Sequence, residues 1–142
     1  MVVLMTPPEP DWGAVLSGHR SPKKIPQLAA IFEAHGIAPD AVASALAAPE
    51  AFVAAAASRP DWVDAYGGPV AAALIAAEIL EQAAALQITV SNIRSHLVAQ
   101  LVDESSVVET ARQLGYSHQH TSRLRKSGAL VPALTALVRK GL

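Results

Sequence analysis

Residues 106–126 read SVVETARQLGYSHQHTSRLRK and carry the start and stop signals of two short helices. Ser106 is a suitable N-cap, and Glu109 stands three residues later, which is the spacing of a capping box. Gly115 lies where a helix commonly ends in the left-handed conformation that glycine adopts without steric penalty. Ser117 can cap a second helix directly afterwards. The stretch therefore predicts a helix-turn-helix, two short helices joined by a tight glycine turn.

Both predicted helices are amphipathic. The apolar face of the first consists of Val107, Val108, Ala111 and Leu114. In the second, over residues 118–126, Thr121 and Leu124 are expected to face inward. The outward-facing residues of this second helix are then Ser122, Arg123, Arg125 and Lys126. Each helix can thus bury one side and leave the other in water.

This pair of helices resembles the helix-turn-helix of bacterial and phage transcription regulators, over residues 106–126 of a 142-residue chain. In that family a small residue stands four positions before the turn glycine, and here Ala111 stands four before Gly115. The apolar positions beside the glycine and within the second helix are held by Leu114, Tyr116 and Leu124. Thr121 departs from the pattern, because the family usually has valine or isoleucine there. A buried threonine hydroxyl must find a hydrogen-bond partner.

The resemblance implies that the second helix enters the major groove of double-stranded DNA. The residues that would face the DNA are Ser117, His118, Gln119, Ser122, Arg123 and Lys126. Gln119 has the chemistry to pair with adenine and Arg123 the chemistry to pair with guanine. Arg112, Arg125 and Lys126 are expected to contact phosphates. The alternative interpretation is that these side chains form the solvated face of a surface helix.

Charge is distributed unevenly along the chain. Residues 1–104 hold five basic and eleven acidic residues, a net charge of −6. Residues 105–142 hold six basic residues against Glu109 alone, a net charge of +5. The end that attracts polyanions is therefore the end that contains the helix-turn-helix, although the motif was identified on independent grounds.

Composition predicts an all-α protein with an alanine-rich core. Hydrophobic residues make up 51% of the chain, but only six residues are Phe, Trp or Tyr. The absence of cysteine excludes disulfides, thiolate catalysis and cysteine-bound zinc, and it agrees with a cytoplasmic location. The first residues lack the basic segment of a signal peptide. The most apolar run, residues 70–77, is followed by Glu78 and Glu81 and is expected to be too short to span a membrane.

The chain is predicted to contain an N-terminal alanine-rich helical domain over residues 1–68, with about the first ten residues disordered. Gly67-Gly68-Pro69 is the clearest break, and a connecting helix is expected over residues 69–90. The helix-turn-helix domain then occupies residues 91–142. A β-branched run at 88–90 favours a helix break near Thr89.

Apolar residues in the connecting region follow alternating spacings of four and three, which is typical of a helix-packing seam. These residues are Ile79, Ala83, Leu86, Val90, Ile93 and Leu97. A helix over residues 92–102 is expected to be the first of the three-helix unit, with Ile93, Leu97 and Leu101 in its core. A last amphipathic helix is predicted from Pro132, and it would cover this unit or meet a second copy of the chain.

The residues favour a sequence-specific DNA-binding transcription regulator, a repressor rather than an activator, that acts as a homodimer in the cytoplasm. No spacing of reactive residues indicates an enzyme, a metal site or a cofactor; His118 and His120 point in different directions on a helix. A membrane partner is not expected. The alternative function is a protein-binding adaptor of the antitoxin or immunity type, which would hold a basic partner through acidic helices in residues 1–88.

Overall fold

The computed structural model describes residues 11–129, and every element in that range is a helix. This confirms the predicted all-α class. The chain forms two compact units, residues 1–83 and residues 84–142, whose boundary lies within helix α5. The predicted arm at residues 1–10 and the predicted last helix from Pro132 lie outside the described residues.

Unit 1 is built from short helices, several of which begin with proline at a position where its missing N–H is not needed. Its helices are α1 (Trp12–Leu16), η1 (Pro22–Lys24), α2 (Ile25–Ala34), α3 (Pro39–Ala47), α4 (Pro49–Ser58), η2 (Trp62–Tyr66) and the first part of α5 (Pro69–Glu104). Asp11 caps α1, since its carboxylate accepts a hydrogen bond from the Ala14 N–H at 2.7 Å.

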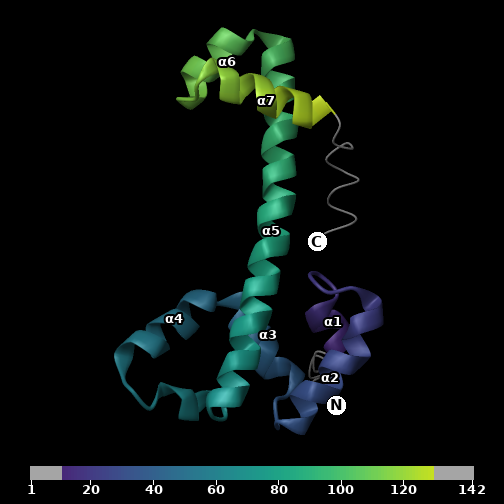
Figure 1. Cartoon of the computed structure of the whole chain (residues 1–142), viewed down its shortest axis with the longest axis vertical. Helices are drawn as coiled ribbons and strands as arrows, with labels where there is room; N and C mark the ends of the chain where they lie inside the picture. Colours follow the sequence, from purple (N-terminus) through teal and green to yellow (C-terminus); the bar gives the residue numbers. More distant parts are fainter. Residues whose placement is uncertain (1–10, 130–142) are drawn as a thin grey trace, which may run out of the picture. The chain divides into compact units, whose positions relative to one another are not determined.

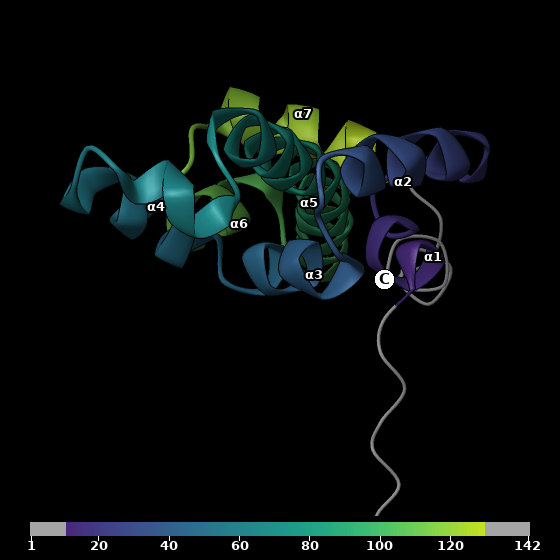
Figure 2. The same ribbon diagram turned by 90° about the horizontal axis from the view of Figure 1, so that it is seen from below.

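The core of unit 1 lies among α1, α2, α3 and the beginning of α5 (Figures 1 and 2). Its buried members are Leu16, Phe32, Ile37, Val42, Leu46 and Ala71. Trp12 stacks on Phe32 with ring centroids 5.0 Å apart, and its indole N–H donates to Glu33 at 3.0 Å. One aromatic pair and a set of aliphatic side chains, mostly leucine, isoleucine and valine, thus fill this core.

A second group of aromatic rings holds the α4 side of unit 1 together. Phe52 contacts Trp62 and Tyr66 edge-on, with centroids 5.2 and 5.1 Å away. Helix α4 has no buried residue, and its Val53 is 65% exposed. The part of unit 1 around α4 is therefore held by few contacts and leaves apolar surface in water.

Glu78 of α5 is almost fully buried, and it forms hydrogen bonds with two residues of the basic loop after α1. Its carboxylate accepts a hydrogen bond from His19 at 2.7 Å and a bidentate pair from Arg20. The hydrogen bond with Glu78 also raises the pKa of the Arg20 guanidinium. These contacts form a buried polar cluster that fastens the loop to α5.

Helix α5 is continuous from Pro69 to Glu104, so the predicted break near Thr89 is wrong. Each β-branched residue lowers the stability of a helix by only about 0.5 kcal/mol relative to alanine. In addition, residues 70–104 contain no glycine or proline that would interrupt the helix. Alanine, leucine and glutamine on both sides favour the helix strongly enough for it to continue across residues 88–90.

The face of α5 that packs in unit 2 differs from the predicted one. Leu97 is 43% exposed, and Ile93 and Leu101 are only partly buried. The buried residues of this segment are Ser95, Val98, Ala99 and Val102. The predicted seam followed the largest apolar side chains, whereas α6 and α7 pack on a side of α5 that carries smaller ones.

Unit 2 combines the second part of α5 with α6 (Val107–Leu114) and α7 (His118–Ala129), which lie side by side against the end of α5 (Figure 1). The predicted first helix ends as observed, at Leu114. The second was expected to stop at Lys126 because Ser127-Gly128 follows, but α7 continues to Ala129. Gly128 lies inside the helix for a packing reason described below.

Candidate nucleic-acid interface

Local capping sets the two ends of α6. The Ser106 side chain accepts a hydrogen bond from the Glu109 N–H at 3.0 Å, which satisfies one N–H of the first turn. At the other end Gly115 has φ +71°, the left-handed conformation, and the Tyr116 N–H donates to the Ala111 carbonyl at 3.0 Å. The glycine turn expected from the sequence is therefore present, with the backbone geometry that requires glycine.

Helix α7 begins with Ser117, whose side-chain oxygen accepts from the His120 N–H at 3.0 Å. Thr121 is fully buried, and its hydroxyl donates to the Ser117 carbonyl at 2.9 Å. The departure from the apolar pattern at Thr121 is thus accommodated, because the hydroxyl bonds to its own helix and only its methyl group enters the core.

The core of unit 2 contains residues from α5, α6 and α7. Val98, Val102 and Leu124 are buried together, with Val107 and Tyr116 packed against them. Two residues predicted on the apolar face of α6 are largely in water: Val108 is 59% and Leu114 39% exposed. Ala111 is buried as predicted, and Thr110, which was not predicted on this face, is buried as well.

Thr110 is fully buried, and its hydroxyl has no hydrogen-bond partner within the part of the chain that the structure describes. An unsatisfied buried hydroxyl destabilises a fold by about 1–3 kcal/mol. We therefore expect Thr110→Val, which keeps the shape, to raise the free energy of unfolding by about 1 kcal/mol in urea titrations.

Thr121→Val is the matched control for this substitution. It removes a hydroxyl that has a partner, so it should leave stability unchanged or lower it by about 1 kcal/mol at most. A Thr110→Val protein that is less stable than the wild type would show that the Thr110 hydroxyl is satisfied in solution.

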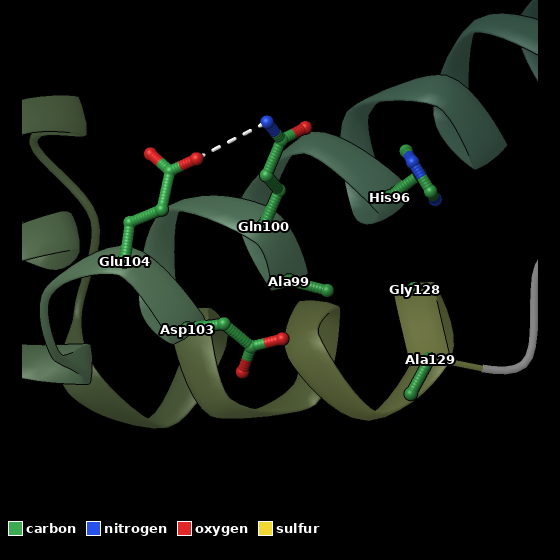
Figure 3. A pocket seen from close by; sticks show the side chains of 7 residues that line it. All are labelled: His96, Ala99, Gln100, Asp103, Glu104, Gly128 and Ala129. Carbon is green, nitrogen blue, oxygen red and sulfur yellow. Dashed lines mark hydrogen bonds between the residues drawn. The ribbon is translucent and has the colours of Figure 1, made fainter.

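Gly128 allows α7 to approach α5 closely. A Cβ atom at this position would lie 1.9 Å from the Ser95 carbonyl oxygen and 3.0 Å from the Ala99 Cβ. The neighbours Gly128 and Ala129 of α7 lie beside Ala99 and His96 of α5 in Figure 3. A glycine that reads as a helix stop in the sequence is therefore the contact point of two helices.

The outer face of α7 carries polar and basic side chains. At about 100° per residue, positions 119, 122, 123 and 126 share one side of the helix, and Thr121, Leu124 and Gly128 occupy the opposite side. Gln119, Arg123 and Lys126 are exposed, and Ser122 is half-buried. Because the buried side is fixed by the core, these four side chains are held pointing away from the protein.

The other residues predicted to contact DNA lie outside this face but at the surface. Arg112, Ser117, His118 and Arg125 are all exposed. The Ser117 oxygen is already engaged as the cap of α7. His120, two residues after His118, is half-buried because its ring packs edge-on against Tyr116, with ring centroids 4.9 Å apart. These contacts hold the beginning of α7 in a defined position.

Two of the predicted phosphate contacts form exposed ion pairs within the protein. The Arg112 Nε donates to Glu109 at 3.0 Å, and this hydrogen bond holds the pKa of Glu109 below its ordinary value. Arg125 donates to Asp103 of α5 at 3.2 Å. No ion pair between described residues involves Arg123 or Lys126. Within residues 11–129, Arg123 and Lys126 therefore offer unpaired positive charge on the outer face of α7.

The hollow beside the α5–α7 crossing, about 510 Å³, does not gather reactive groups. Its carboxylates already have partners, since Asp103 accepts from Arg125 and Glu104 accepts from Gln100 at 3.2 Å (Figure 3). Within residues 11–129 no three His, Asp or Glu side chains converge so as to hold a metal ion. Comparisons with models of protein families, with curated proteins and with solved structures found no significant match to this chain.

Proposed function

We propose that this chain is a sequence-specific double-stranded DNA-binding transcription regulator that reads the major groove with α7. The observation that supports this most strongly is the composition of the outer face of α7. Gln119, Ser122, Arg123 and Lys126 share one side of a helix whose opposite side is buried. A helix that is held by its inner side and presents hydrogen-bonding and cationic groups outward has the properties that groove recognition needs.

The proposed roles follow from the side-chain chemistry. Arg123 would pair bidentately with guanine and Gln119 with adenine, and these two would set the preferred sequence. Lys126 would neutralise a phosphate, which contributes affinity without sequence preference. Arg112 and Arg125 would contribute less than these, because each must first leave a carboxylate of its own protein. As a small regulator it would act by repression, by occupying its site.

Selection of bound sequences from a random double-stranded DNA pool, followed by titrations at two salt concentrations, tests this function. We expect a defined preferred sequence and an affinity that falls steeply with salt. Arg123→Ala should weaken binding to that sequence by about 1–3 kcal/mol, roughly 5- to 150-fold, and relax the preference at one base pair. Lys126→Ala should weaken binding to all sequences alike and lower the salt slope by about 1.

Arg59→Ala is the matched control, because Arg59 is an exposed arginine of unit 1 that pairs with Asp61. It should leave the preferred sequence and the salt slope unchanged. The regulator proposal would be refuted by a pool that enriches no sequence, together with an Arg123→Ala protein that retains every binding activity of the wild type.

The second candidate is a protein-binding adaptor that uses the acidic N-terminal helices. It is favoured by the net charge of −6 in residues 1–104 and by the exposed apolar surface of α4, where Val53 is 65% exposed. A basic protein would complement this charge. If this were the sole function, Arg123→Ala would not alter binding to the partner, whereas charge reversal at exposed acidic residues of unit 1 would weaken it.

A further inference from the structure

Four apolar residues of α5 form an exposed stripe, here called the α5 seam: Leu86, Val90, Ile93 and Leu97. All four belong to unit 2. Leu86 is 51%, Val90 52% and Leu97 43% exposed, and Ile93 is partly exposed. Their spacings of four, three and four are those of the two core positions of a coiled-coil heptad, so they lie on one side of the helix.

The α5 seam lies on the opposite side of α5 from α6 and α7. At about 100° per residue, the buried positions 95, 98, 99 and 102 point roughly 160° away from the α5 seam. The helix-turn-helix therefore packs on one side of α5 and leaves the heptad side without cover from any described residue. The α5 seam is not needed for the core of its own unit.

A lipid bilayer is one environment that α5 could enter, because by length and composition this helix is apolar enough to cross a membrane. However, Ile79 packs in the core of unit 1, and Ser95 is buried in unit 2. The α5 segment between them, residues 80–94, is roughly 22 Å long at about 1.5 Å per residue, shorter than the roughly 30 Å hydrocarbon layer. Protein is the better occupant for a stripe of this length.

We propose that the α5 seam pairs with the α5 seam of a second copy of this chain, in parallel and in register. A heptad stripe is self-complementary, because a two-fold axis brings identical side chains together in knobs-into-holes packing. Between residues 84 and 100, only Arg94 carries a fixed charge, so self-pairing meets little like-charge repulsion. A charged partner would find no complementary charges along this stripe.

Self-association through the α5 seam does not depend on the proposed DNA function, because it follows from α5 alone. If both hold, parallel pairing puts two helix-turn-helix pairs at the same end of the paired helices, and the bound DNA would contain two half-sites related by two-fold symmetry. The interface is short, so we expect a dimer that dissociates at about micromolar concentration, as small interfaces do.

Sedimentation velocity of the full chain over about 1–200 µM tests the pairing, a range that brackets the expected micromolar dissociation constant. Val90→Glu should weaken dimerisation by about 100-fold or more, because each dimer would bury two unpaired carboxylates. Ile88→Glu is the matched control: Ile88 is 65% exposed and lies on the far side of α5 from the α5 seam. It should dimerise like the wild type. A monomeric wild type, or equal effects of the two substitutions, would overturn the proposal.

Because the chain has no cysteine, a single introduced cysteine can form a disulfide only between two copies. We expect Val90→Cys to cross-link under mild oxidation, since paired core positions of a parallel in-register coiled coil have Cα atoms about 6 Å apart, within disulfide reach. Ile88→Cys should not. Cross-linking of Ile88→Cys at the same rate would contradict the proposed register.

Two further measurements identify a different occupant. If the wild type is monomeric but a chain ending at Ala129 dimerises, the α5 seam is covered by residues 130–142 of the same chain. If the wild type is monomeric and floats with phosphatidylcholine–phosphatidylglycerol vesicles, while Val90→Glu does not, the occupant is lipid. Either result would refute the pairing of two copies. Neither result depends on whether α7 binds DNA.

Discussion

Replacing Gly128 by alanine is expected to separate α7 from α5 and to lower the free energy of unfolding of unit 2 by about 3 kcal/mol or more, at or above the upper end of overpacking effects. The added Cβ would lie 1.9 Å from the Ser95 carbonyl oxygen and 2.5 Å from its carbonyl carbon. Both atoms are backbone, so no change of rotamer relieves the clash. If α7 reads DNA, the same variant should lose sequence-specific binding.

Circular dichroism during urea unfolding measures this effect, and hydrogen exchange locates it at α7. Ser127→Ala is the control, because Ser127 is the exposed neighbour in the same helix. Alanine at an unhindered glycine inside a helix would instead stabilise by about 1 kcal/mol. A Gly128→Ala protein that is more stable than the wild type would therefore show that the two helices are farther apart than described.

Glu78→Ala should destabilise unit 1 by about 3–5 kcal/mol, the usual consequence of removing one partner from a buried ion pair. The substitution leaves the His19 and Arg20 side chains, which are 3% and 16% exposed, without their carboxylate. Water cannot replace that partner without opening the contact between the loop and α5. The loop that follows α1 should then detach, and the core around Leu16 should loosen.

Both tryptophans of the chain, Trp12 and Trp62, lie in unit 1, so tryptophan fluorescence follows the unfolding of that unit alone. Glu81→Ala is the matched control: Glu81 is half-exposed and lies 3.6 Å from Arg20, so its loss should change stability by less than about 1 kcal/mol. Equal effects of the two substitutions would mean that Glu78 is hydrated in solution and that the cluster does not hold the loop.

The glycine turn between α6 and α7 was predictable because its signals are local. A serine cap acts on an N–H three residues away, and the conformation of Gly115 depends on its own backbone, so sequence order alone places the ends of α6 and the start of α7. Once these ends are placed, helical periodicity assigns the outer face of α7. The same reasoning identified Arg123 and Lys126 as exposed, as the structure has them.

The packing of α5 was not predictable in the same way. Periodicity identified its largest apolar stripe but could not show that α6 and α7 pack on the opposite side, where Ser95 and Ala99 permit close approach. The exposure of Leu97 follows from this choice. Side-chain size favours burial in general, but the distance between two helix axes selects the small residues at their contact.

By itself, the sequence determined the all-α class, the serine caps of α6 and α7, the glycine turn between them, and the concentration of positive charge near the carboxyl end. Only the tertiary structure decided that Gly128 is a helix contact rather than a helix stop, and that Glu78 is buried with His19 and Arg20. The physical reason is the range of the interactions. Caps and turns depend on atoms within a few residues, whereas burial depends on which distant segments of the chain come together.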